Sequence, residues 1–237
     1  MRGLFALAPL ALLSGCLDFG ALGKSFCATA GVARCDDFEN DGASPTWQPV
    51  MTGGSIGRTV PTGDPDGAFR GKQSLRLDVP VGGQAQLEDV ATTPSLAHDL
   101  FVRAFVYFPL APPDGDLALV AVRDGAGAPL AQLRFENAAA RLVAADGREA
   151  GAPVALTGDQ WLCLEVGLIR DAVPRVELYV DAADDTTGAD AQITQVDLTG
   201  AAATRIGVDR SGATATQAST VWMDDVIIDG TRIGCAK

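Results

Sequence analysis

Several short stretches of this chain alternate between hydrophobic and polar residues. In residues 75–79 the apolar side chains Leu75, Leu77 and Val79 occupy every second position, and residues 175–180 repeat the pattern. Successive side chains of a β-strand point to opposite faces, so this alternation is typical of a strand with one buried face. Both stretches are therefore predicted to be strands.

Two longer runs, residues 101–108 and 161–169, are apolar at nearly every position. Strands that are covered on both faces have this composition, so both runs are predicted to lie at the centre of packed sheets. Each run contains one conspicuous charge, Arg103 in the first and Glu165 in the second. These charges either form a structural ion pair or belong to a ligand-binding groove, and the sequence leaves both interpretations open.

The dipeptide Asp-Gly is predicted to mark turns between strands. It occurs six times, beginning at residues 41, 66, 114, 124, 146 and 229, and it favours the positive φ angles of tight hairpins. The alanine-rich stretch 137–145 is the one part of the chain whose composition suits a helix. Because it follows an alternating stretch and precedes Asp146-Gly147, it is predicted to be a hairpin instead.

No internal repeat, low-complexity tract or long linker divides residues 27–237. Many short strands with few helices indicate a β-sandwich or a barrel. A chain of this length can bury about 70% of its unfolded surface in one domain. We therefore expect a single all-β domain over residues 27–237.

The N-terminus has the features of an export signal. Arg2 provides a positive start, and residues 3–13 form an apolar run that is too short to span a bilayer as a helix. The sequence Leu-Ser-Gly-Cys that ends at Cys16 resembles the lipobox of bacterial lipoproteins. An ordinary secretory signal, in which Cys16 is incidental, is the alternative.

The lipobox resemblance implies three parts. Residues 1–15 are a signal peptide, Cys16 receives acyl chains such as palmitate, and residues 16–26 form a tether to the domain. The protein is then held at a membrane of the cell envelope by its lipid. Leu17 is not the aspartate that directs inner-membrane retention in enteric bacteria, so we expect the outer membrane.

The charge of the chain limits its partners. The formal net charge is −12, and loss of Arg2 with the leader makes the remaining chain one unit more negative. Nucleic acid binding requires clusters of Lys and Arg, and the sequence contains no such cluster. We therefore expect no nucleic acid partner, and we expect anionic polysaccharides to be repelled unless local arginines outweigh the overall field.

Four cysteines remain when Cys16 is set aside, an even number in an exported chain. Disulfides are the natural interpretation, and three pairings are possible. We favour the pairing of Cys27 with Cys35 and of Cys163 with Cys235, because the first closes a short loop and the second would fasten the C-terminus to an inner strand. A zinc site is the alternative, but the chain has no Cys-x-x-Cys and one histidine.

Six sequence runs together look like the concanavalin A-like jelly roll, a β-sandwich of two antiparallel sheets. The pattern is closest to the laminin-G-like and polysaccharide-lyase-like domains of exported bacterial proteins. Order and spacing of the runs carry this resemblance. The runs are residues 35–39 (CDDFE), 71–77 (GKQSLRL), 101–108 (FVRAFVYF), 161–165 (WLCLE), 176–181 (VELYVD) and 221–228 (VWMDDVII).

The resemblance implies a structural Ca²⁺ where the first and last strands meet. The positions that match its carboxylate and carbonyl ligands are Asp37 or Glu39, Gly71, and Asp225 or its neighbour Asp224. Calcium prefers six to eight oxygen ligands, so these residue types suit it. In the alternative interpretation, one of the two adjacent aspartates faces solvent and the other binds loop amides.

The resemblance also implies a ligand groove on one sheet, where rings stack on sugars and polar side chains bind hydroxyl or carboxyl groups. The groove would form if the candidate strands are neighbours and their faces coincide. Trp47 is the best candidate for an exposed stacking ring, whereas Trp161 and Trp222 suit a core. The candidate groove residues are Arg103, Tyr107, Gln132, Arg134, Glu165 and Tyr179.

The sequence lacks the strongest catalytic patterns of this architecture. Glycoside hydrolysis needs two positioned carboxyl groups, and the Glu-x-Asp-x-x-Glu spacing of the laminarinase-like branch is absent, as is a Gly-x-Ser-x-Gly elbow. A polysaccharide lyase acting on uronates would use Tyr107, Tyr179 or His98. We therefore expect a non-catalytic, lectin-like lipoprotein, with a lyase and a structural or protein-interaction lipoprotein as alternatives.

Overall fold

The computed structural model describes a β-sandwich. It describes residue 27 and residues 32–39, 47–59, 68–89, 97–110, 117–136, 138–155, 157–182, 186–211 and 217–235. Within these ranges the chain forms strands and turns and no α-helix. The leader, Cys16 and the tether lie outside the described residues.

The strands form two sheets, and every pair of strands is antiparallel. Sheet A has the order β13 (Ala191–Thr194), β12 (Arg175–Val180), β11 (Gln160–Ile169), β6 (Leu100–Phe108), β15 (Ser219–Asp229), β4 (Ser74–Val79) and β3 (Ser55–Thr59), and β1 (Arg34–Asp36) also pairs with β15. Sheet B has the order β10 (Glu149–Ala155), β9 (Ala139–Ala144), β8 (Pro129–Glu136), β7 (Leu117–Asp124), β14 (Ala201–Asp209), β5 (Gln84–Asp89) and β2 (Trp47–Thr52). Two antiparallel sheets confirm the predicted fold class.

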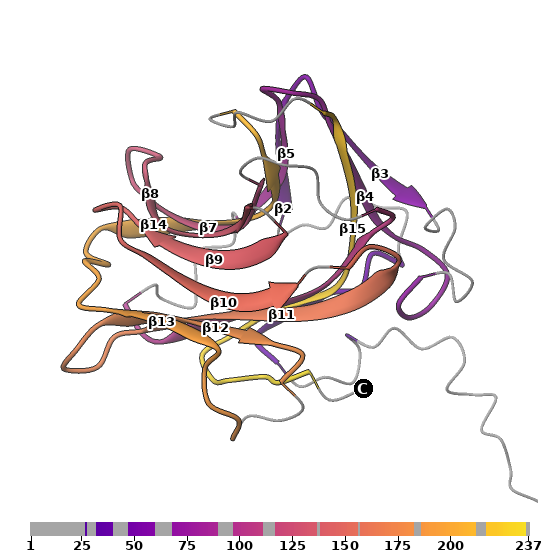
Figure 1. The fold of residues 1–237 in the computed structure, drawn as a ribbon. Helices are drawn as coiled ribbons and strands as arrows, with labels where there is room; N and C mark the ends of the chain where they lie inside the picture. The colour runs from indigo at the N-terminus through magenta and orange to yellow at the C-terminus, as the bar shows by residue number, and fades with distance from the viewer. Residues whose placement is uncertain are drawn as a thin grey trace, which may run out of the picture.

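Both sheets are bent in the same direction, and sheet B lies on the inside of the bend (Figure 1). Sheet A runs along β13, β12 and β11 and then rises through β15, β4 and β3, so it forms the outer layer. The outer face of sheet B is therefore concave. Between the sheets lies one large hydrophobic core, to which Leu77 and Leu164 contribute from sheet A and Leu133 and Ile206 from sheet B.

The two long apolar runs lie at the centre of sheet A, as predicted. They form β11 and β6, which are neighbours, and nearly all of their residues are buried on both faces. The inner face packs in the main core, where Val106 and Leu162 lie. On the outer face Phe105 and Cys163 pack with Cys235 from the end of the chain. An additional layer of chain on sheet A thus explains why these strands have no polar face.

Residues 139–144 of the alanine-rich stretch form β9, a strand of a hairpin, which confirms the prediction. β8 and β9 pair across this turn, and Ala138 has a positive φ of 55°. The turn after β7 differs from the expected Asp-Gly hairpin. There Gly127 has the positive φ angle of 84°, and the Asp124 carboxylate accepts hydrogen bonds from the backbone N–H groups of Ala126 and Ala128. Asp124 therefore stabilises a longer loop.

Both predicted disulfides are present. Cys27 is bonded to Cys35, with their Cα atoms 5.2 Å apart, and Cys163 is bonded to Cys235, with their Cα atoms 5.9 Å apart. All four cysteines are used in these bonds, so they are not available as zinc ligands. The second bond joins residues 72 positions apart and fastens the C-terminal segment, residues 230–235, to β11.

Removal of the two disulfides should have unequal effects on stability. Replacing Cys163 and Cys235 by alanine should lower the free energy of unfolding by about 4 kcal/mol, because the bond closes a long loop. The disulfide between Cys27 and Cys35 closes a loop of only 8 residues. Replacing this pair by alanine should therefore lower the free energy of unfolding by about 2.5 kcal/mol. Urea unfolding of the oxidised proteins measures both values. Equal losses would contradict the loop-length argument.

Candidate functional site

The concave outer face of sheet B carries polar side chains on neighbouring strands. Residues directly opposite each other on paired strands share a face, so the register defines rows across the sheet. The first row contains Gln48, Glu88, Arg205, Ala121 and Gln132. The second row contains Thr52, Gln84, Asp209, Ala118, Arg134 and Arg141. We refer to these two rows, with the residues between them and Arg123, whose guanidinium reaches Asp209 of the second row, as the concave polar face.

Two ion pairs lie at the centre of the concave polar face. Arg205 Nε is 2.6 Å from Glu88 Oε2, and Arg123 Nη2 is 3.2 Å from Asp209 Oδ2. Arg123 also donates a hydrogen bond of 2.7 Å to the carbonyl oxygen of Gly127. Burial lowers the pKa of Arg123, and repulsion from the Arg205 guanidinium lowers it further. The two cations are therefore close together, and the carboxylates balance their charges.

Gln86 lies between these ion pairs on the same face. Its neighbours Ala85 and Leu87 belong to the core, so the Gln86 side chain points to the concave side. It is completely buried, and neither its amide oxygen nor its amide nitrogen has a hydrogen-bond partner. An unsatisfied buried amide is costly. Gln86 is therefore the polar group of this face that most needs an additional partner.

Gly207 allows β14 to approach β5 beside Gln86. It stands opposite Gln86 in the register and has a φ angle of 122°. A Cβ atom at this position would lie 2.5 Å from the carbonyl oxygen of Ala85. Only glycine combines this backbone conformation with so close an approach. The floor of the concave polar face thus depends on the absence of a side chain at residue 207.

Two of the six residues predicted to bind ligand lie on the concave polar face. Gln132 and Arg134 both come from β8, and Arg134 Nε donates a hydrogen bond of 2.8 Å to Gln132 Oε1. Beside them on β9, Arg141 forms ion pairs with Glu149 at 3.2 Å and with Glu136 at 3.8 Å. The arginines of β8 and β9 are therefore already engaged with neighbouring side chains.

The other four predicted residues lie on the outer face of sheet A. Arg103 and Tyr107 belong to β6, Glu165 to β11 and Tyr179 to β12. Each is at most 5% exposed. The expectation that all six residues line one groove is wrong, because their strands belong to two sheets whose outer faces point in opposite directions.

The C-terminal segment covers this part of sheet A. The Glu165 carboxylate accepts hydrogen bonds from the backbone N–H groups of Ile233, at 2.7 Å, and Gly234, at 3.1 Å. Arg103, which stands opposite Glu165 in the register, donates through Nη1 to the carbonyl oxygen of Gly234 at 3.3 Å. Cys235 then bonds to β11. Both residues therefore have structural partners in the C-terminal segment, where Glu165 also forms an ion pair with Arg232 at 3.6 Å.

The two tyrosines of sheet A are also enclosed. Tyr107 lies between Trp161 and Trp222, with ring centroids 5.5 and 5.8 Å away, and its hydroxyl group donates a hydrogen bond of 2.7 Å to Asp159. The Tyr179 ring lies 3.6 Å from the guanidinium carbon of Arg232, a cation–π contact. Both phenols therefore stabilise the packing on the convex side of the protein.

Trp47 is not the exposed stacking ring that the sequence suggested. It begins β2, is 8% exposed and packs in the main core. One side of it lines an apolar groove of about 440 Å³ between β2 and β3, which Met51, Ile56 and Leu87 also line. Trp47 thus lies at the open edge of the sandwich, where one side of its ring packs in the core and the other side lines this groove.

The predicted calcium residues meet where β1, β4 and β15 come together. Asp37 and Glu39 follow β1, Gly71 precedes β4, and Asp225 lies at a bulge of β15. The Glu39 carboxylate accepts hydrogen bonds from the backbone N–H groups of Lys72, at 2.7 Å, and of Gln73, at 3.0 Å. A Cβ on Gly71 would lie 2.3 Å from Glu39 Oε1, so glycine is required here.

The adjacent aspartates of β15 are both fully buried. Asp224 accepts hydrogen bonds from Ser74 Oγ at 3.0 Å and from the Arg70 backbone at 3.3 Å, and desolvation, reinforced by the Asp225 charge, raises its pKa to about 8. Desolvation also raises the pKa of Asp225 to about 6, although Arg70 and Arg103 oppose the shift. Asp225 is therefore a buried carboxylate with incomplete compensation.

Asp225 has the least satisfied carboxylate of this cluster. Neither oxygen has a hydrogen-bond partner, although Arg70 Nε lies 3.3 Å from Oδ2. Among the described residues no group of three His, Cys, Asp or Glu side chains is close enough to hold a metal ion. A cation here would thus need backbone carbonyl oxygens or water beside Asp225, which suits the flexible coordination of calcium.

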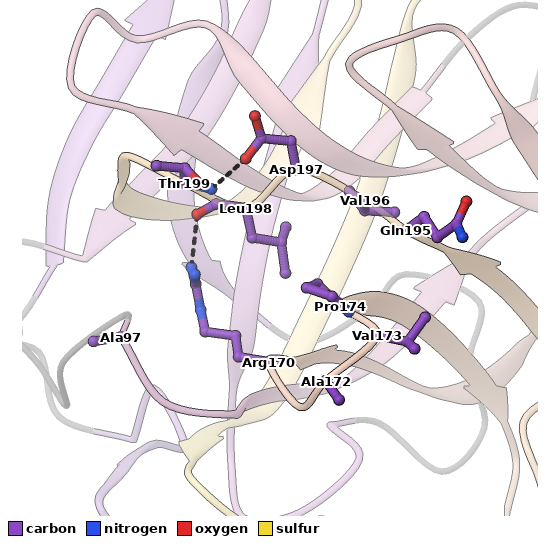
Figure 2. Close-up of a pocket in the computed structure, with 10 residues that line it drawn as sticks. All are labelled: Ala97, Arg170, Ala172, Val173, Pro174, Gln195, Val196, Asp197, Leu198 and Thr199. Atoms are coloured by element: carbon purple, nitrogen blue, oxygen red, sulfur yellow. Dashed lines mark hydrogen bonds between the residues drawn. The ribbon is translucent and has the colours of Figure 1, made fainter.

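A separate pocket of about 530 Å³ opens at one end of the sandwich, between the β11–β12 turn and residues 195–199 (Figure 2). The Arg170 guanidinium points across it and donates a hydrogen bond of 3.0 Å to the carbonyl oxygen of Leu198. Asp197 accepts a hydrogen bond from the Thr199 backbone. The Arg170 hydrogen bond therefore joins the two loops that border this pocket.

The sequence did not identify the centre of the concave polar face. Glu88 and Gln86 lie in an alternating stretch, residues 84–89, that had the same signal as the other predicted strands. Arg205 and Asp209 lie in β14, which is far from β5 in the sequence. Their proximity arises from a strand pairing that alternation does not specify, because alternation marks a face but not a neighbour.

Comparison with solved structures supports the fold. A solved structure described as cellulose induced protein Cip1 is 18% identical, and the alignment covers 86% of this chain and 100% of that chain with a TM-score of 0.62. The globular domain of T. cruzi calreticulin is 11% identical over 85% of this chain and 88% of that chain, with a TM-score of 0.50. An alginate lyase from Pseudomonas aeruginosa is 15% identical over 80% of this chain and 87% of that chain, with a TM-score of 0.49.

No protein-family model and no curated protein sequence matches the chain. The first two structural likenesses and the two bent antiparallel sheets define the class of the protein as a jelly-roll β-sandwich of the concanavalin A-like type. At these identities the likeness concerns the fold alone. In the part of the chain that the structure describes, no helix is long and apolar enough to cross a membrane.

Proposed function

We propose that this protein is a non-catalytic polysaccharide-binding domain whose ligand lies across the concave polar face of sheet B. The unpartnered amide of Gln86 carries the proposal, because it is a buried polar group without compensation at the centre of a polar, concave sheet. Arg205 and Arg123 flank it with their carboxylate partners. A row of such groups suits the many hydroxyl groups of an extended sugar chain.

The fold comparison agrees with this proposal. The cellulose induced protein shares the fold over its whole length, and its name connects it with a polysaccharide. A concave sheet lined by leucine, valine and alanine would instead favour a structural lipoprotein. The two rows of the concave polar face contain Glu88, Gln132 and Arg134 instead, and these polar side chains favour a ligand-binding role.

The positions of the titratable rings argue against a polysaccharide lyase. Abstraction of the proton next to a uronate carboxylate requires a base, which in the lyase hypothesis is a tyrosine or a histidine. The chain has two tyrosines and one histidine. Tyr107 and Tyr179 lie on sheet A, and His98 is an exposed residue just before β6. None of these three rings lies on the concave polar face.

Replacement of Arg205 by alanine should weaken polysaccharide binding about tenfold or more, because it removes a donor and leaves Glu88 unpaired on the concave polar face. Arg76→Ala is the matched control, since Arg76 is an arginine paired with Asp78 on the opposite, convex side. Affinity electrophoresis through gels that contain immobilised polysaccharides measures the binding of both variants and of the parent protein. Equal binding by Arg205→Ala and the parent protein would refute this location of the site.

A structural calcium ion between Glu39 and Asp225 is a second part of the proposal. Asp225 would supply carboxylate oxygens, and backbone carbonyl groups or water beside it would complete the coordination. The Asp225 oxygens support this choice, because they are buried and have no hydrogen-bond partner. The ion would supply positive charge to carboxylates that burial disfavours. It would also join the chain after β1 to the chain before β4.

Calcium should raise the melting temperature more at pH 8 than at pH 5. Without the ion, burial raises the pKa of Asp224 to about 8 and of Asp225 to about 6, above the ordinary aspartate value. The stability that their protonated forms provide is therefore lost as the pH rises from the ordinary aspartate pKa, about 4, to about 8, so the loss is greater at pH 8 than at pH 5. Calcium should restore it.

Melting curves in EDTA and in calcium at both pH values test the ion, with Asp225→Asn as the variant that should no longer respond. Magnesium serves as the control cation. An EDTA-treated protein that melts at the same temperature as the calcium-loaded protein at pH 8 would exclude the site.

Attachment to a membrane through Cys16 is the third part. The lipobox-like sequence that ends at Cys16 supports it, and the tether of residues 17–26 would keep the domain close to the membrane surface. We propose the outer membrane of the cell envelope as its location. A stationary domain of this kind suits a binder better than an enzyme that must reach dispersed substrate.

Labelled palmitate should be incorporated into the protein in bacteria and should be lost in Cys16→Ser, because the thiol accepts the first lipid. Cys27→Ser provides the control, since Cys27 forms a disulfide and should leave the labelling unchanged. Gel autoradiography and membrane fractionation measure the two effects. Labelling that persists in Cys16→Ser would overturn the anchor.

A further inference from the structure

We infer that the ligand of the concave polar face is an uncharged polysaccharide, recognised through its hydroxyl groups, rather than a polyuronate. This inference rests on the proposed function. It follows from the way in which the arginines of this face are paired, and from the chemistry of Gln86, whose buried amide has no hydrogen-bond partner.

Three arginines of the concave polar face have carboxylate partners within the protein. Arg205 pairs with Glu88 at 2.6 Å, and Arg123 pairs with Asp209 at 3.2 Å. The Arg141 guanidinium reaches two carboxylates from β10 and β8, at 3.2 and 3.8 Å. Every one of these cations is therefore neutralised by a neighbour before any ligand arrives.

Arg134 is engaged as well, through its bond to Gln132. At Arg205 or Arg123, a sugar carboxylate would have to compete with Glu88 or Asp209, and the displaced protein carboxylate would remain on a half-buried surface. Each new ion pair between a sugar carboxylate and an arginine would leave one protein carboxylate without its partner. The replacement therefore provides little net attraction for a polyuronate. The net charge of −12 on the chain adds long-range repulsion of polyanions.

Gln86 has the opposite preference. Its amide nitrogen donates and its amide oxygen accepts, and both lack a partner. A hydroxyl group also donates and accepts, so hydroxyl groups can satisfy both ends of the amide. A carboxylate accepts only. Because Gln86 is completely buried, a ligand reaches it only when the side chains above it move aside, and this exchange favours neutral groups that cost little to desolvate.

The charge-balanced pairs suit hydroxyl groups in a second way. An arginine that is held by a carboxylate keeps further N–H groups in a fixed fork, and the carboxylate keeps free lone pairs. The pair of Arg205 and Glu88 therefore offers donors and acceptors together. Neighbouring hydroxyl groups on a sugar ring present the same combination, which a surface of unpaired cations would not match.

Calorimetry with the full chain tests the inference. The uncharged probes are cello-oligosaccharides, xylan and laminarin, and the polyuronates are alginate and polygalacturonate. We expect binding to at least one uncharged probe. Its affinity should change by less than about twofold between 50 and 500 mM salt, because salt screens interactions between charges and this ligand has none. Polyuronates should not bind.

Two variants sharpen the test. The double variant Glu88→Gln, Asp209→Asn removes both balancing charges and should gain polyuronate binding that weakens at least tenfold with salt. Gln86→Met conserves the side-chain volume and removes the unsatisfied amide. It should weaken binding of the uncharged probe about tenfold without lowering the melting temperature, a combination that a purely structural glutamine would not produce.

The outcomes separate the inference from the proposed function. Salt-dependent binding of a polyuronate by the parent protein, with no binding of uncharged probes, would overturn the inference and leave polysaccharide binding intact. Failure of every probe to bind the parent protein would overturn both. Binding of an uncharged probe that is insensitive to Arg205→Ala would place the ligand elsewhere and would also overturn the inference.

Discussion

The Glu165 carboxylate, fully buried on the outer face of sheet A, holds the end of the chain through the backbone N–H groups of Ile233 and Gly234. This contact would be unfavourable alone, because a buried charge needs compensation. Two backbone donors and nearby arginines provide it. The disulfide at Cys235 then makes the attachment permanent. The packing on the outer face of β6, β11 and β12 depends on this closure.

Closure of sheet A encloses the polar side chains on the outer face of β6, β11 and β12. Arg103 and Tyr107 are polar side chains on strands that would otherwise be open to solvent, yet the covering segment and the aromatic rings leave them almost unexposed. On sheet B the arginines stand beside carboxylates in rows that follow the bend of the sheet. Polar residues of the same type therefore have different roles on the two faces.

The end of β15 shows how the fold concentrates charge at one point. Asp224 and Asp225 are consecutive, and a bulge in the pairing of β15 with β6 lets both be buried. Asp225 adopts a positive φ of 44°, which is unusual for a residue with a side chain. The strands that meet here come from both ends of the chain, so compensation of the Asp225 charge would link the N-terminal and C-terminal parts of sheet A.

The sequence by itself determined the all-β class, the strand positions around Leu77 and Leu178 and the central runs that contain Arg103 and Glu165, because alternation and composition are local properties. It favoured both disulfide pairs among three possible pairings, which the structure decided, and the jelly-roll type followed from the family resemblance. The sequence could not determine the site. Gln132 and Arg134 were recognised as polar positions on a strand, but so were Tyr107 and Tyr179, which lie on the other sheet. Arg205 meets Glu88, and Arg123 meets Asp209, through pairings of β14 with β5 and β7. Only the tertiary structure decided these partners and the face that stays open, because strand pairing and the covering of sheet A join residues that are far apart in the chain.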